Sequence, residues 1–159
     1  MSKTGKLIYF LLTLMFFIGV DTYFSNLILE DLRHNFVSNR VFDLIFVKNT
    51  GAAFSILENS NIFLIIFSIV ATALILYYLI KNVQKFSTIA CFWCAMLTSG
   101  ICCNLYERIC FGYVRDFFKL NFVEFPVFNI SDIFINIGVF AIIIIIVKNN
   151  YLKNNETNI

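Results

Sequence analysis

Charged residues are scarce in this chain. Only 14% of its 159 residues are Asp, Glu, Lys or Arg, and it contains one histidine and one proline. Soluble domains usually have about one quarter charged residues, so the composition argues against a water-facing fold. The net charge of +2 is too small to indicate a nucleic-acid partner.

Cysteine is absent from the first 90 residues, and the single histidine, His34, is distant in sequence from all five cysteines. Cys91 and Cys94 form a C-x-x-C pair, a spacing that redox and metal sites use. The surrounding run is apolar, however, which favours buried free thiols. We therefore expect no metal site here.

Long apolar runs are what the chain has in place of charge. Hydrophobic residues make up 60% of the sequence, and a helix that crosses a bilayer needs about 20 of them in succession. The first run follows Lys3 and Lys6, as in a signal peptide, but it is long and no small-x-small cleavage site follows, so we expect a retained helix. Four spans are predicted, at Leu7–Tyr23, Asn61–Ile80, Phe86–Cys103 and Ile130–Val147.

An even number of spans places both termini on one side of the membrane. The basic residues divide six against six between the two sides, so their number alone gives no orientation. One group, which consists only of lysines, is packed into short flanks, where the positive-inside bias acts most strongly. We therefore expect both termini in the cytoplasm. These lysines are Lys3, Lys6, Lys81, Lys85, Lys148 and Lys153.

Two segments between the spans have the composition of strands. Residues 40–48 and 113–122 are rich in β-branched and aromatic residues with partial alternation, and a turn signal follows the first at Asn49-Thr50-Gly51. They are expected to pair on the outer surface of the bilayer. The predicted fold class is an all-α integral membrane protein with four transmembrane helices and a small extracytoplasmic β-sheet.

Two aspartates lie near the outer ends of apolar segments, Asp116 in the second strand-like segment and Asp132 at the start of the last span. Carboxylates at a membrane boundary are costly and are usually paired, hydrated or functional. Two that are brought together share one proton, and such a pair can activate water and protonate a leaving amine. Simpler interpretations are a helix cap at Asp132, Asn129 or Ser131, and an exposed acid at Asp116.

Other polar and small residues stand near these acids. Asn104 and Arg108 share a helix face, where Arg108 could pair with a carboxylate and Asn104 could bind a substrate carbonyl or a catalytic side chain; a solvated helix end is the alternative. Asp21, near the end of the first predicted span, is either a boundary acid in water or a support for a neighbouring loop. Gly51-Ala52-Ala53 is either an ordinary turn or a place where a bound chain approaches closely.

Four blocks together resemble the lipoprotein signal peptidase family, also called signal peptidase II. They are NTGAAFS at residues 49–55, GICCNLYER at 100–108, GYVRDF at 112–117 and PVFNISD at 126–132. The resemblance covers nearly the whole chain, in which the blocks keep the family's order and spacing. The chain departs from the usual family pattern at Cys103, Glu107 and Ser131, where Gly, Asp and Ala are common.

The resemblance implies a single membrane-embedded aspartic peptidase domain over residues 1–159. It implies that Asp116 and Asp132 are a catalytic dyad that cuts bacterial prolipoproteins just before a cysteine carrying diacylglycerol, without a metal or nucleotide cofactor. Its partners would be these precursors and membrane lipids, and its place the bacterial cytoplasmic membrane with the active site facing outward. The residues that bind substrate or support the site would be Asp21, Asn49, Gly51, Asn104, Arg108 and Asn129.

Two other functions fit a small polytopic protein. A membrane scaffold or transporter subunit would use its acids as an ion path, but such a path needs charges along the bilayer depth, and the predicted spans lack them at their centres. A lipoprotein needs a cysteine just after an N-terminal apolar run, whereas the first cysteine here is Cys91.

Overall fold

The computed structural model describes residues 1–34, 37–51 and 56–156, with side chains through Tyr151. Four long helices carry two short strands in the connections before α2 and before α4. The elements are α1 (Lys3–Asp31), β1 (Phe42–Asn49), α2 (Asn61–Asn82), the 3-10 turn η2 (Val83–Lys85), α3 (Thr88–Phe111), β2 (Val114–Leu120) and α4 (Ile130–Glu156).

The four predicted spans are confirmed, since every helix is long and apolar enough to cross a membrane. Three helices extend beyond the predicted apolar spans: α1 continues past Tyr23 to Asp31, α3 past Cys103 to Phe111 and α4 past Val147 to Glu156. The falling hydropathy after Tyr23 marks the end of the apolar stretch, but no proline or glycine interrupts the helix there. Asp21 consequently lies within α1 rather than near its end.

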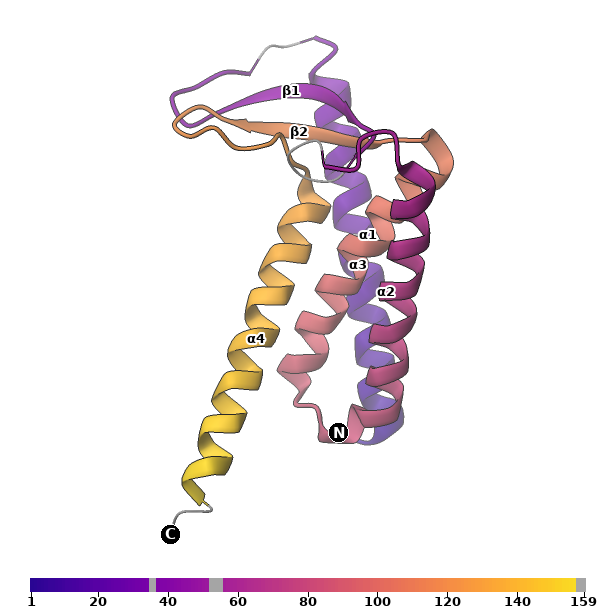
Figure 1. The fold of residues 1–159 in the computed structure, drawn as a ribbon, viewed down its shortest axis with the longest axis vertical. Helices are drawn as coiled ribbons and strands as arrows, with labels where there is room; N and C mark the ends of the chain where they lie inside the picture. The colour runs from indigo at the N-terminus through magenta and orange to yellow at the C-terminus, as the bar shows by residue number, and fades with distance from the viewer. Residues whose placement is uncertain (35–36, 52–55, 157–159) are drawn as a thin grey trace.

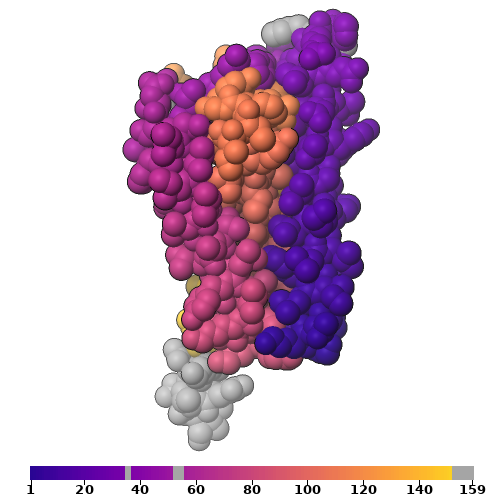
Figure 2. Space-filling view, turned by 90° about the vertical axis from the view of Figure 1, so that its right-hand side faces the viewer, coloured from indigo at the N-terminus to yellow at the C-terminus, as the bar shows by residue number. Residues whose placement is uncertain are grey.

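Helix α3 is the centre of the bundle and packs against α1, α2 and α4. The start of α1 and the end of α4 lie at the same end of the molecule, while α4 leans away from α2 toward that end (Figure 1). We call this the inner end and the opposite one, which carries the strands, the outer end. On one flank α3 lies between α1 and α2 (Figure 2), and many of the large side chains on the outer faces of the helices are exposed apolar groups. A bilayer accommodates this surface, which in water would favour aggregation.

The inner end is held by apolar packing. Six buried residues form a group that we call the inner cluster, which joins α1, α2, η2 and α3: Phe10, Leu79, Val83, Cys91, Cys94 and Ala95. Lys6 closes this end by donating from Nζ to the carbonyl oxygens of Gln84, at 3.0 Å, and Phe86. These carbonyls lie where the chain turns from α2 into α3, so the charge meets acceptors that no helix bond uses.

The strands pair as predicted. β1 and β2 form an antiparallel two-stranded sheet across the outer end of the bundle (Figure 1), with Val47 opposite Asp116 and Lys48 opposite Arg115. The register is irregular between Leu44 and Val47. The reversal from α3 into β2 depends on Gly112, whose φ of 80° lies in the left-handed region that glycine adopts without strain. This turn brings the second strand back over the end of α3.

Candidate active site

Asp116 is buried in the sheet, with 1% of its surface exposed. Asn49, at the end of β1, donates from Nδ2 to its Oδ2 at 2.8 Å, and Asn129 donates to its Oδ1 at 3.0 Å. Burial, and secondarily the charge of Asp132, raises the pKa of Asp116 from 3.8 to about 7. The interpretation of Asp116 as an exposed surface acid is therefore wrong.

Asp132 and Asn129 cap α4 reciprocally. The Asn129 Oδ1 accepts from the backbone N–H of Asp132 at 2.9 Å, and the Asn129 N–H donates to the Asp132 Oδ2 at 3.1 Å. This is a capping box, in which the N-cap residue and the third helical residue satisfy each other's free N–H groups. Asn129, rather than Ser131, is thus the N-cap. Capping alone does not account for Asp132, because its other oxygen accepts from Asn104 Nδ2 at 2.9 Å.

Two asparagine side chains join the carboxylates. The Asn129 amide donates to Asp116 and also to the Oδ1 of Asn104, at 3.0 Å in both cases. Asn104, from α3, holds Asp132 with the other atom of the same amide. The two carboxylates are therefore linked by a chain of bonds that runs from Asp116 through the amides of Asn129 and Asn104 to Asp132.

Arg108 is buried below the sheet, so the interpretation of a solvated helix end is wrong. Its Nη1 donates to the carbonyl oxygen of Asn104 at 3.2 Å and its Nη2 to that of Gly51 at 3.0 Å. The Gly51 N–H in turn donates to Asn49 Oδ1 at 2.9 Å. Within the part of the chain that the structure describes, Arg108 forms no ion pair with a carboxylate; the one ion pair there joins Arg115 and Glu107. Its charge nevertheless acts on the pKa of Asp116, which it lowers.

These contacts close a ring, which we call the polar ring. It runs through six side chains and the Gly51 backbone, and it ties both strands to α3 and to the start of α4. Its side chains are those of Asn49, Asp116, Asn129, Asp132, Asn104 and Arg108.

Asp21 lies outside the polar ring, behind the first turn of α4. Its Oδ1 accepts from the Ser131 hydroxyl at 2.6 Å, and both residues are buried. Neither sequence interpretation fits this position, since Asp21 is buried away from bulk water and holds a helix rather than a loop. The turn is also fixed from α3, because a Cβ on Gly100 would come within 2.5 Å of the Ser131 carbonyl oxygen.

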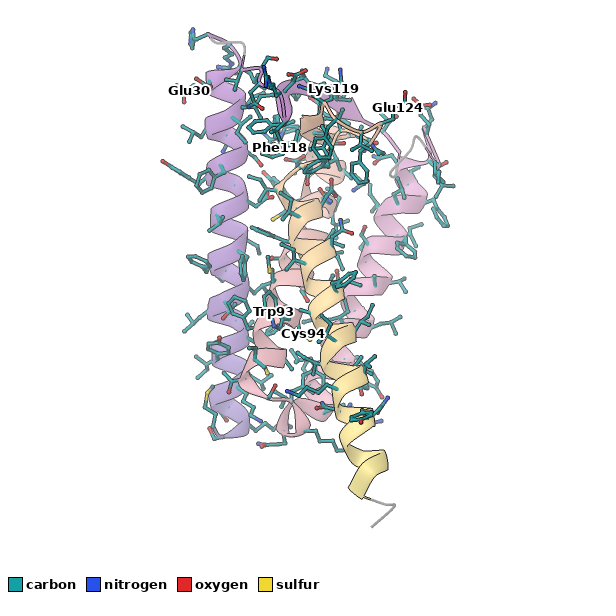
Figure 3. The ribbon with its side chains drawn as sticks, turned by 90° about the vertical axis from the view of Figure 1, so that its left-hand side faces the viewer. Glu30, Trp93, Cys94, Phe118, Lys119 and Glu124 are labelled. Carbon is teal, nitrogen blue, oxygen red and sulfur yellow. The ribbon has the colours of Figure 1, made fainter. Side chains whose placement is uncertain are left out.

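A groove of about 1020 Å³ opens beside Asp116. One of its walls holds Asn49 and Gly51, and the other is the segment from Lys119 to Val127. Lys119 and Glu124 lie at the outer end beside the sheet, whereas Trp93 and Cys94 lie deep among the helices (Figure 3). The C-x-x-C thiols are thus remote from the carboxylates. Ala52 and Ala53, expected to admit a bound chain, fall outside the described residues.

Sequence reasoning missed two contacts beside the acids. Glu107 bonds to Arg115, the residue before Asp116, and Asp21 bonds to Ser131, the residue before Asp132. Opposite charges on the two sides of the Gly112 turn were a usable signal for the first contact. No signal in the sequence indicates the second, whose partners are 110 residues apart.

The fold and site define a class: a polytopic membrane protein with two linked carboxylates, one buried and one partly buried, at one end of its bundle. The family model of signal peptidase (SPase) II matches residues 13–148. The chain therefore belongs to the signal peptidase II family and is a membrane peptidase.

Individual relatives agree with this assignment. The lipoprotein signal peptidase of Streptococcus thermophilus (strain CNRZ 1066) is 34% identical over 134 residues, which cover 82% of this chain and 87% of the relative. That of Clostridioides difficile (strain 630) is 33% identical over 132 residues, covering 81% and 88%. Two solved bacterial membrane enzymes have a similar fold. The first has a TM-score of 0.77 at 26% sequence identity, and the match covers 89% of this chain and 88% of that enzyme. The second has a TM-score of 0.76 at 28% identity, and the match covers 87% of this chain and 92% of that enzyme.

Proposed function

We propose that this protein is an aspartic endopeptidase that removes signal peptides from bacterial prolipoproteins, and that Asp116 and Asp132 are its catalytic pair. It cuts just before a cysteine that already carries diacylglycerol. Family membership supports signal-peptide removal from prolipoproteins. One observation carries the aspartic mechanism: Asn129 binds both carboxylates, and its amide also bonds to Asn104, which binds Asp132.

The pair works through one shared proton. Asp116, whose pKa is raised to about 7, is assigned as the acid that gives its proton to the scissile carbonyl oxygen, while Asp132 takes a proton from the attacking water. When the tetrahedral intermediate collapses, its hydroxyl proton returns to Asp116 and the proton on Asp132 passes to the leaving nitrogen. The pair then holds one proton again.

The position of the pair suits a substrate that is partly lipid. Asp116 lies in the sheet at the outer end of the helices, so water reaches the scissile bond while acyl chains remain in the bilayer. The groove beside Asp116 takes the polypeptide. Both termini are cytoplasmic, as the lysines in the short flanks favour, and reporter fusions that place the C-terminus outside would contradict this orientation.

The decisive experiment uses purified protein and a prolipoprotein that carries diacylglyceryl cysteine. Asp116→Asn and Asp132→Asn are each expected to abolish cleavage, because an amide side chain does not exchange the required proton. Asp43→Asn is the matched control, since it changes the same residue type in β1, where the carboxylate binds Ser38 and Asn121 outside the polar ring. Substantial cleavage by either dyad variant would refute the assignment.

The lipid requirement is tested separately. Acyl chains contribute about 0.8 kcal/mol of membrane affinity per buried CH₂, and they hold the scissile bond at the depth of the carboxylates. One precursor is compared in detergent micelles with and without its diacylglyceryl group, and only the lipidated form is expected to be cut. Equal cleavage rates for the two forms would show that the enzyme does not recognise the lipid, and they would not contradict the aspartic mechanism.

A further inference from the structure

We infer that Glu107 is a positioning residue for the reaction: by binding Arg115 it fixes strand β2 so that Asp116 faces Asp132. The inference rests on the proposed role of Asp116. The hydrogen bonds that the described residues give Glu107 all come from Arg115, so it acts through its neighbour rather than on substrate.

The Glu107 carboxylate binds both the backbone and the side chain of Arg115. Its Oε2 accepts from the Arg115 backbone N–H at 2.7 Å, and its Oε1 accepts from Nε at 2.7 Å and contacts Nη2 at 2.6 Å. Charge-assisted forked contacts of this kind have strict geometry. Because one carboxylate holds the main chain as well as the guanidinium, it fixes the strand itself and not only a side chain.

Glu107 binds the strand at Arg115, one residue before Asp116. Successive side chains of a strand point to opposite faces, so Arg115 turns toward α3 and α1 while Asp116 turns into the polar ring. Among the described residues β2 pairs with one strand, β1, and its other edge bonds to Phe128 from Phe117 and Phe118, after Asp116. Its start follows the Gly112 turn directly. A shift of Arg115 along or across the strand would therefore move Asp116 with it.

Arg115 is itself held from two further directions. Its Nη1 donates to Asn26 of α1 at 3.3 Å, and its guanidinium lies over the ring of Phe111, 5.1 Å from the centroid. The two charged side chains are largely buried, with 13% of Arg115 and 8% of Glu107 exposed. A buried pair that loses one member leaves an uncompensated charge, so this ion pair maintains one strand position.

The length of the side chain is the testable feature. Aspartate carries the same charge as glutamate on a side chain that is one methylene shorter. Glu107→Asp keeps the charge and shortens the reach, so the carboxylate cannot hold the backbone N–H and the guanidinium with the present geometry. This variant leaves unchanged the two charged groups that act on Asp116, which are Asp132 of α4 and Arg108 of α3.

The experiment measures kcat, KM and the pH profile with the lipidated precursor. Glu107→Asp is expected to lower kcat roughly 10- to 100-fold, the cost of a misplaced catalytic group, at unchanged KM. The limb of the profile that reports Asp116, near pH 7 in the parent protein, should move to lower pH because a displaced Asp116 gains water. No variant that lacks a carboxylate at position 107 is expected to restore the kcat of the parent protein.

Two further variants make the result decisive. Leu79→Ala, in the inner cluster, is the stability control and should leave kcat and the pH limb of the folded enzyme unchanged. Arg115→Lys keeps the charge but loses the fork, and it should reproduce the Glu107→Asp effects; it decides the question if Glu107→Asp does not fold. Parent-like kcat and pH limb in either folded variant would overturn the positioning role. Should Asp116→Asn remain active, the proposed function itself fails, whereas an inactive Asp116→Asn beside a parent-like Glu107→Asp removes the positioning role alone.

Discussion

The two ends of the helix bundle are stabilised by different physics. At the inner end, six apolar residues pack without directional contacts, and such burial depends mainly on area and volume. At the outer end, the polar ring joins its members by hydrogen bonds of 2.8 to 3.2 Å. Each ring amide there serves two or more partners, so one substitution disturbs several contacts. From this comparison we expect apolar burial at the inner end to supply mainly stability, and the polar ring to set mainly the geometry of the site.

The largest effect is expected from Asn129→Ala, which breaks the polar ring at its most connected member. The variant loses the bonds to Asp116 and Asn104 and the cap of α4. Cleavage should fall at least about 100-fold because the pair loses its alignment, and the lost cap should cost about 1 kcal/mol of stability.

Ser87→Ala is the matched control for that variant. It removes an N-cap of the same kind at the start of α3, where the Ser87 hydroxyl accepts from the Ala90 N–H. A similar loss of stability with full cleavage is expected in the same assay. If both variants lost activity equally, capping rather than the polar ring would explain the effect of Asn129.

The pH dependence sharpens the electrostatic side of the comparison. In the proposed mechanism Asp116 holds a proton and gives it to the carbonyl oxygen, and the pKa of Asp116 is raised to about 7. Activity should therefore decline as pH rises above about 7, approaching a tenfold loss per pH unit as the protonated fraction falls. The measurement is kcat/KM of the parent enzyme across the neutral range. A rate that instead rises through this range would make Asp116 the base of the pair.

At the inner end, Leu79→Ala should separate stability from activity. Leu79 is almost fully buried in the inner cluster, so truncation should cost about 2–5 kcal/mol of stability. Thermal denaturation in detergent measures this loss. The folded fraction should cleave at the parent rate, and a reduced rate per folded molecule would show that the two ends are coupled.

The smallest effect on cleavage is expected from replacing all five cysteines with alanine. Cys91 and Cys94 belong to the inner cluster, and the proposed mechanism uses no thiol. Some stability should be lost, because alanine leaves small voids in a packed interior. Complete inactivity of a folded variant would restore a thiol or metal interpretation.

Much of this architecture could be predicted from local patterns. Four apolar runs predicted the spans, and the alternation around Asp43 and Asp116 predicted both strands, because bilayer thickness and strand pleating impose fixed periods on sequence. The end of α1 was missed since hydropathy reports the membrane and not the helix, and residues 24–31 have no helix-breaking residue.

The site was predictable as a set of residues but not as a set of bonds. Local sequence indicated a cap of α4 at Asn129, Ser131 or Asp132, yet not that the Asn129 amide reaches Asp116 and Asn104. The sequence left Arg108 either paired with a carboxylate or solvated at a helix end, whereas it is buried and binds backbone carbonyls. Those partners come together only after the strands fold back over α3. A pattern within one segment of the sequence cannot predict contacts that depend on three segments.

The bond between Asp21 and Ser131 has a consequence for biosynthesis. Asp21 enters the membrane with the first helix, while its hydroxyl partner lies 110 residues further along the chain. A carboxylate within a membrane span is costly until it is paired or hydrated, so the first span carries part of this cost until α4 supplies the Ser131 hydroxyl. Insertion of α4 relieves it, and the same event brings Asp132 to the site. Insertion of the last helix thus completes both the membrane fold and the proposed active site. A nascent chain that stops before α4 lacks the Ser131 partner of Asp21 as well as Asp132.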